Sequence, residues 1–283
     1  MTGSTSLDAT LQRLDRIIED ACAERSHLGV FPAMYRTVTA AVRQAVRTGG
    51  LFDDDARVEH LTVVFADLYF GAYDNYRSGE DAAACWAVAF EAAEAPRGRM
   101  LLQHLLLGMN AHINLDLGVA TVAAAGDDLA SVQRDFVRVN EILFQVLDHL
   151  QDGLGDVSPR MKMLDRLGGS WDERVMRVGI RTCRDLAWTF AGTLVDAEDP
   201  AAVTLVRDED AAWLARGMLR PWSPVGLSAR MISRVESRDI PAVVDSLARI
   251  RVDLETVERA SDAAMADAPP APASLRAAIT RRR

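Results

Sequence analysis

The residues that could do chemistry lie close together in residues 103–118, within a segment rich in leucine. His112 and Asp116 are four residues apart, so their side chains can meet across one turn of a helix. A carboxylate that hydrogen-bonds one ring nitrogen fixes the tautomer of an imidazole. The pair therefore predicts either a general acid–base couple or two ligands of one divalent metal ion.

His104 lies on the same ridge of this segment, about 12 Å from His112 along the helix axis. The two imidazoles can bind one ion only if the helix kinks, and Gly108 lies midway between them. Otherwise they serve two ions or the two ends of one substrate. Asn110 and Asn114 form another polar line on the opposite side, where they would orient the substrate or the metal ligands.

A further polar line lies on residues 59–77, where His60, Asp67, Gly71 and Asp74 project onto one face of a helix. Apolar residues flank this line on both sides, which predicts a buried helix. A buried aspartate is costly unless it pairs, binds a cation or lines a wet cavity. Asp67 is therefore a candidate metal ligand or substrate contact, and a line that simply faces solvent is the alternative.

Two further patterns could bind an anion or magnesium. Arg181 lies four residues before Asp185, which predicts a salt bridge or a site for a substrate carboxylate or phosphate. Asp127, Ser131 and Asp135 resemble the second magnesium motif of class I terpene synthases, where oxygen ligands at helical spacing hold magnesium against diphosphate. Aspartate stands where that motif usually has its last glutamate, and Asp127 also suits the start of a helix.

Helical periodicity runs through almost the whole sequence, and no segment alternates as a strand would. Ser6 is expected to cap the first helix. The expected helices cover residues 7–18, 33–48, 56–77, 81–94, 98–125, a segment after Asp127 or Asp128 that reaches Leu150, and residues 171–195, 200–220 and 240–260. The sequence thus predicts an all-α, single-domain bundle of about nine helices over residues 1–262. Residues 263–283 are rich in proline and end in three arginines, which predicts a flexible tail.

Composition restricts the function classes further. Hydrophobic residues make up 49% and charged residues 26%, which is typical of a globular protein. The net charge of −9 argues against binding nucleic acid through bulk charge. The longest apolar run, residues 100–109, contains Gln103 and His104, so no membrane span is expected. The three cysteines are far apart, and the amino terminus lacks the basic and apolar parts of a secretory signal, which favours a cytoplasmic protein.

The run N-A-H-I-N-L-D-L, residues 110–117, resembles a bacterial domain-of-unknown-function family, the five-nine-nine-five family. Similarities at residues 65–67, 135–143, 164–169 and 184–188 extend the resemblance over most of the chain. That family has no established activity, so the resemblance implies an all-helical single domain. A looser likeness is to zinc-dependent phospholipase C, whose histidine–aspartate–histidine spacing is not reproduced by His104, Met109 and His112.

The leading hypothesis is an enzyme that acts on a small molecule in a cavity of the bundle, by hydrolysis or by a proton-transfer or cyclisation step of biosynthesis. Its catalytic residues would be His112, Asp116 and His104, and its substrate contacts would be Asn110, Asn114, Asp67 and Arg181. A divalent metal (zinc, iron, manganese or magnesium) would be held by His104, His112, Asp116 and Asp67.

Two alternatives stay open. One is a non-catalytic helical protein that binds a ligand or partner, in which the polar lines pair the helices. The other is a magnesium-dependent enzyme that resembles a terpene cyclase. We expect a small-molecule substrate and neither nucleic acid nor a membrane as a partner, and a homodimer is left open.

Overall fold

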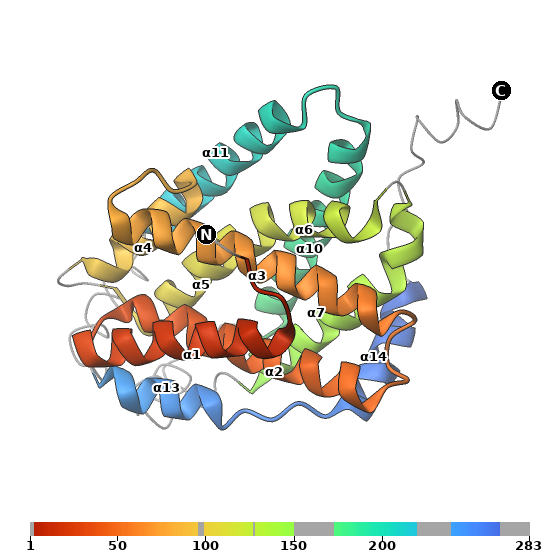
Figure 1. The fold of residues 1–283 in the computed structure, drawn as a ribbon, viewed down its shortest axis with the longest axis horizontal. Helices are drawn as coiled ribbons and strands as arrows, with labels where there is room; N and C mark the ends of the chain where they lie inside the picture. The colour runs from red at the N-terminus through yellow and green to blue at the C-terminus, as the bar shows by residue number, and fades with distance from the viewer. Residues whose placement is uncertain (1–2, 96–98, 127, 150–172, 220–238, 267–283) are drawn as a thin grey trace.

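The computed structural model describes residues 3–95, 99–126, 128–149, 173–219 and 239–266 (Figure 1). Within these ranges every regular element is a helix, and none is a strand. The helices are α1 (Leu7–Glu24), α2 (Val30–Thr48), α3 (Asp55–Ser78), α4 (Ala84–Glu94), α5 (Leu101–Ala111), α6 (Leu117–Ala125), α7 (Gln133–Asp148), α10 (Glu173–Asp196), α11 (Pro200–Leu219), α13 (Ile240–Ala248) and α14 (Leu254–Ala266). Because α5 and α6 belong to one continuous helix, the described ranges hold ten helices, which confirms the predicted all-α bundle.

The continuous helix Leu101–Ala125 carries the polar residues of interest. Its two α-helical parts are joined by a π-helical turn, His112–Asp116, in which the amide of Leu117 donates to the carbonyl of His112. α5 packs against α2, α4 and α11, and α6 packs against α3 and α10. All five residues of the π-turn are buried. The turn therefore lies where helices from both halves of the chain meet.

By length and composition alone, the same helix is apolar enough to cross a membrane. It has 25 residues and a mean hydropathy of 1.2 over its best 18-residue window, so the expected break at Gln103 and His104 does not interrupt it. However, 83% of that window is buried inside the protein. A helix covered by its neighbours in this way needs apolar residues all round its circumference, which explains the many leucines.

The amino-terminal end of α4 is capped by a residue from a distant helix. The residue at its N-cap, Ala83, has no side-chain oxygen that could accept from the first amides. Asp208 of α11 accepts instead from the amides of Ala84, at 2.6 Å, and Cys85, at 2.8 Å. A carboxylate at this end also interacts favourably with the helix dipole. The contact fixes α11 against α4, directly before the buried Trp86.

The structure corrects the prediction of one helix over residues 240–260. α13 ends at Ala248 and α14 begins at Leu254. The amide and carbonyl of Asp253 in the break pair with the side chain of Gln145, both at 2.9 Å. α14 continues to Ala266, so the first four residues of the expected tail are helical. The rest of the tail, and the predicted helix ends at residues 98, 150, 171 and 220, lie outside the described residues.

Candidate active site

The predicted pair of His112 and Asp116 is in direct contact within the π-turn. Nδ1 of His112 lies 2.9 Å from Oδ2 of Asp116. The indole Nε1 of Trp86 donates to the same oxygen, also at 2.9 Å. Both members of the pair are about 3% exposed. When Asp116 is ionised its carboxylate can only accept, and the imidazole then carries its proton on Nδ1 and has a free lone pair on Nε2.

Five aromatic rings surround the imidazole of His112, and we call them the aromatic box. Phe65 of α3 stacks on it face to face, with 3.5 Å between ring centroids and an interplanar angle of 7°. The other rings are steeply inclined to it, at centroid distances between 4.5 and 6.3 Å: Tyr35, Phe31, Trp86 and Tyr69. Helices α2, α3 and α4 thus each contribute to the box.

Burial sets the charge state of the pair. It lowers the pKa of His112, and the hydrogen bond and charge of Asp116 oppose this shift only in part. It also raises the pKa of Asp116, against the opposing effects of His112 and Trp86. The cause in both cases is desolvation, which disfavours the charged form. The imidazole is therefore neutral at neutral pH and able to accept a proton at Nε2.

Three buried polar atoms of the site have no hydrogen-bond partner in the part of the chain that the structure describes. They are Nε2 of His112 and the hydroxyls of Tyr35 and Tyr69, whose rings lie 4.5 and 6.3 Å from the imidazole. A buried polar group without a partner costs about 1–3 kcal/mol. Such groups need an explanation, and an acceptor and hydroxyl donors within one cluster of rings are groups with which a polar small molecule could form hydrogen bonds.

The asparagines of the second polar line hold the π-turn to α11. Nδ2 of Asn114 donates to Oδ1 of Asn110 at 3.0 Å, and Nδ2 of Asn110 donates to the carbonyl of Ala211 at 2.9 Å. Arg207 donates to the backbone carbonyl of Asn114 at 2.6 Å and to its side-chain oxygen at 3.0 Å. The structure therefore uses both amides for contacts between helices, whereas the sequence suggested substrate contacts.

His104 lies in a different environment from His112. Its ring stacks on that of His27, with 4.7 Å between centroids. Burial, together with the nearby His27 and Arg99, lowers the pKa of His104 to about 3. Its Nδ1 is buried and has no partner among the residues that the structure describes. No local pattern predicts the contact with His27, because the two histidines meet only through tertiary packing.

Asp67 and Arg181 also lie apart from the His112 pair. Both carboxylate oxygens of Asp67 accept from the amide of Ser4, at 3.0 Å, and the residue is half-buried. His60, on the same line, is exposed, so this face of α3 borders solvent. This agrees with the alternative prediction of a polar line that faces solvent. Arg181 is exposed and lies over the ring of Phe144.

A metal centre of the four predicted ligands is not assembled. In the described ranges, no three histidine, cysteine, aspartate or glutamate side chains come together in a group that could hold a metal ion. His112 and Asp116 are adjacent, but His104 contacts His27 and Asp67 contacts Ser4. Nε2 of His112 is a suitable single ligand, because a carboxylate on the other nitrogen is typical of metal-bound histidine.

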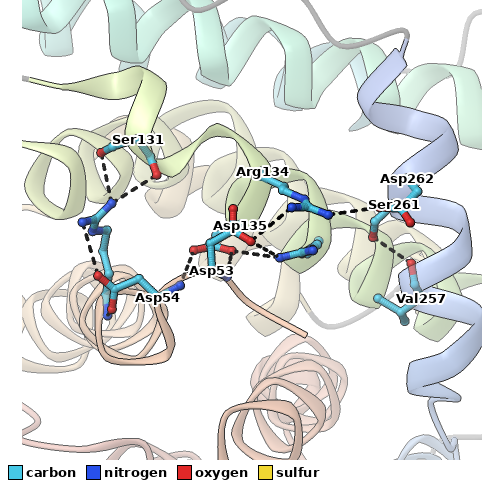
Figure 2. A network of polar contacts seen from close by, with 10 residues as sticks. Asp53, Asp54, Ser131, Arg134, Asp135, Val257, Ser261 and Asp262 are labelled. Carbon is cyan, nitrogen blue, oxygen red and sulfur yellow. Dashed lines mark hydrogen bonds and ion pairs between the residues drawn. The ribbon is translucent and has the colours of Figure 1, made fainter. Parts of the chain in front are cut away.

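The terpene-synthase-like motif forms a network at the start of α3, shown in Figure 2. Asp135 accepts from the backbone amides of Asp53, at 2.7 Å, and Asp54, at 3.1 Å. Ser131 accepts from Arg57 and donates to the carbonyl of Asp128. These oxygens thus connect α3 and α7, a use that leaves them little capacity for magnesium; Asp127 lies outside the described residues.

The rings of the aromatic box and the role of Arg207 were not predicted from the sequence. A signal for the box exists, because Phe31 and Tyr35 on α2, and Phe65 and Tyr69 on α3, are spaced by four residues. Each pair places two rings on one face of its helix. Arg207 gave no signal, since its contact with Asn114 spans 93 residues of sequence.

The chain was compared with protein families, curated proteins and solved structures. The model of one family, described as a family of unknown function (DUF5995), matches residues 7–221. This match confirms the family resemblance inferred from the sequence. No curated protein and no solved structure matches the chain. The family description states no activity.

Proposed function

This chain belongs to DUF5995, a family of unknown function, and we propose that it is an enzyme that moves a proton on a small molecule. His112 is the general acid–base, and Asp116 is the residue that orients it. The observation that carries this proposal is the asymmetry of the imidazole. Its Nδ1 is tied to a buried carboxylate, while its Nε2 is buried without a partner among the described residues.

The arrangement has the properties that proton transfer requires. Asp116 fixes the tautomer that presents a lone pair on Nε2, and its negative charge stabilises the imidazolium that forms when Nε2 takes a proton. Trp86 holds the carboxylate in place. π-helical turns such as His112–Asp116 occur frequently at functional sites, because they place side chains where a regular helix does not.

A substrate reaches Nε2 only when a ring of the aromatic box moves. Phe31, Tyr35, Tyr69 and Trp86 are buried, whereas Phe65 is only partly buried. Phe65 therefore lies on the side of the imidazole that is nearest to solvent, and a change of its rotamer is the smallest movement that uncovers the ring. We expect substrates that are small and uncharged, since the box itself offers aromatic surface.

The second candidate is a non-catalytic protein that binds a small ligand. The dense covering of His112 favours it, because a sealed polar pair can serve to specify how the helices pack. The hydrogen bonds from Asn110 to Ala211 and from Arg207 to Asn114 serve in this way, because each joins the continuous helix to α11. The two candidates differ in whether His112 exchanges protons with a bound molecule.

Solvent-deuterium incorporation tests the proposal without a known substrate. The full chain is incubated in D2O with a bacterial metabolite extract, and mass spectrometry records which small molecules gain deuterium. We expect incorporation with the wild type and with the exposed-site control His60→Gln, and its loss with His112→Gln. Circular dichroism checks that each variant is folded.

Absence of any protein-dependent incorporation, or incorporation that survives His112→Gln, would refute the enzymatic proposal. Retention of a small molecule that His112→Gln releases, with no deuterium gain, would favour the binding protein. Elemental analysis of protein purified without a histidine tag gives a further comparison. Stoichiometric zinc, iron or manganese that is lost in His112→Gln would indicate a metal-dependent reaction in place of the proposed proton transfer by His112 alone.

A further inference from the structure

Large apolar side chains gather on the outer face of α11. Among the described residues, the exposed large apolar side chains are Leu205, Val206, Trp213 and Leu214 of α11, together with Leu186 of α10. Trp213 is 75% exposed and Leu205 65%. A monomeric protein rarely leaves such a group uncovered, and tryptophan is enriched where proteins bind one another. Figure 1 shows α11 along one edge of the molecule.

The two faces of α11 are separate. The inner face holds Asp208, Ala211, Ala212 and Ala215, which are buried against the bundle. At about 100° per residue, Leu205, Val206, Glu209, Trp213 and Arg216 fall within an arc of about 100° on the other side. The outer face is therefore a strip with leucine and valine at its amino-terminal end, and with tryptophan nearer its carboxyl-terminal end, between Glu209 and Arg216.

The charges on this strip are arranged so that the strip can pair with a copy of itself. Glu209 and Arg216 flank Trp213 on the same face, both are exposed, and within one copy they form an ion pair with 3.7 Å between Oε2 and Nη1. If two α11 helices lie antiparallel about a two-fold axis beside Trp213, residue 209 of each copy comes opposite residue 216 of the other. A two-fold interface of identical patches requires this kind of self-complementarity.

We propose that the outer face of α11 binds a second copy of this chain, so that the protein is a homodimer with the two Trp213 side chains near its axis. The pairing joins an apolar centre to two equivalent Glu209–Arg216 ion pairs between the copies, which replace the pair that each copy makes within itself. Charges at the edge of an apolar contact mainly fix register and partner choice. This inference does not depend on the activity proposed for His112, which lies on the opposite side of α11.

Charge exchange tests both the surface and the register. Size-exclusion chromatography with light scattering measures the mass of the full chain across the micromolar range. We expect twice 30.9 kDa for the wild type. Glu209→Arg and Arg216→Glu each place like charges opposite one another and should weaken dimerisation at least tenfold. The double variant Glu209→Arg/Arg216→Glu restores both pairs and should restore the dimer.

The matched control is Glu258→Arg, which makes the same charge change at an exposed position of α14 and should leave the dimer intact. Trp213→Ala should give a folded monomer with an unchanged circular dichroism spectrum, because the side chain lies outside the core. A monomeric wild type, or a dimer that survives Trp213→Ala and both single charge variants, would overturn the proposal. Loss of the dimer in the single variants without recovery in the double variant would overturn the antiparallel register.

Discussion

Gly108 is a position at which one added methyl group should disturb the aromatic box. A Cβ atom built on Gly108 would lie 2.5 Å from both Cγ and Cδ2 of Phe31, closer than any ordinary contact. Phe31 is 7% exposed and packs edge-on against Tyr69, Trp86 and His112. Its ring therefore cannot move away from the new methyl group without displacing the rings around the imidazole.

The expected magnitude follows from two opposing effects. Overpacking a core by a methyl group costs about 1–3 kcal/mol, while alanine gains up to about 1 kcal/mol over glycine inside a helix. Gly108→Ala should thus lower the free energy of unfolding by up to about 2 kcal/mol. Gly71→Ala on α3 is the matched control, since its Cβ would meet nothing within 4 Å. It should raise the free energy of unfolding by about 0.5–1 kcal/mol.

Urea unfolding at pH 7 measures both values, and the difference between the two variants isolates the clash at about 1–3 kcal/mol. The near-ultraviolet circular dichroism, to which the buried Trp86 contributes, reports whether the box has changed. Gly108→Ala should alter this signal, and Gly71→Ala should not. If Gly108→Ala is as stable as Gly71→Ala and leaves the aromatic signal unchanged, the close packing of Phe31 against α5 is refuted.

Two more predictions concern His104 and Arg207. The pKa of His104 is lowered to about 3 from a usual 6.5, so between these values only the unfolded chain binds the proton. The titration of His104 alone should therefore lower the free energy of unfolding by about 1.4 kcal/mol for each pH unit below 6.5. His104→Gln should reduce the slope measured by urea unfolding at pH 7, 6 and 5, and an unchanged slope contradicts the assignment. Arg207→Gln removes the guanidinium from Asn114 and should cost about 1–2 kcal/mol, because charged hydrogen bonds to a half-buried group are lost. Hydrogen exchange at the amide of Leu117 should quicken in this variant and not in the exposed-site control Arg249→Gln.

Local sequence rules predicted the contact at the centre of the site but not its surroundings. The spacing of His112 and Asp116 was sufficient, because residues four apart meet on a helix whatever the rest of the fold does. The π-turn that contains them leaves no mark in the sequence, since the same residues suit a regular helix. The donor from Trp86 and the stacking of Phe65 depend on how α3 and α4 pack, which periodicity does not determine.

Helix ends show the same division between local and tertiary causes. Ser6 caps α1 by accepting from the amide of Ala9, and Gly79 ends α3 with a positive φ of 76°, both as residue type predicts. The break between α13 and α14 contains neither glycine nor proline. It is stable because Gln145, over 100 residues earlier in the chain, satisfies the backbone of Asp253. A single sequence does not reveal such a distant partner.

Arg207 and Asp208 are neighbours on α11, yet they hold different parts of the bundle. Arg207 binds the π-turn that contains His112, and Asp208 caps the helix that carries Trp86. The π-turn with its His112–Asp116 pair and the helix that carries Trp86 thus share one support, and a displacement of α11 would act on both at once. If occupancy of the outer side of α11 changes the proton affinity of His112, then by thermodynamic reciprocity protonation of His112 changes that occupancy by the same factor.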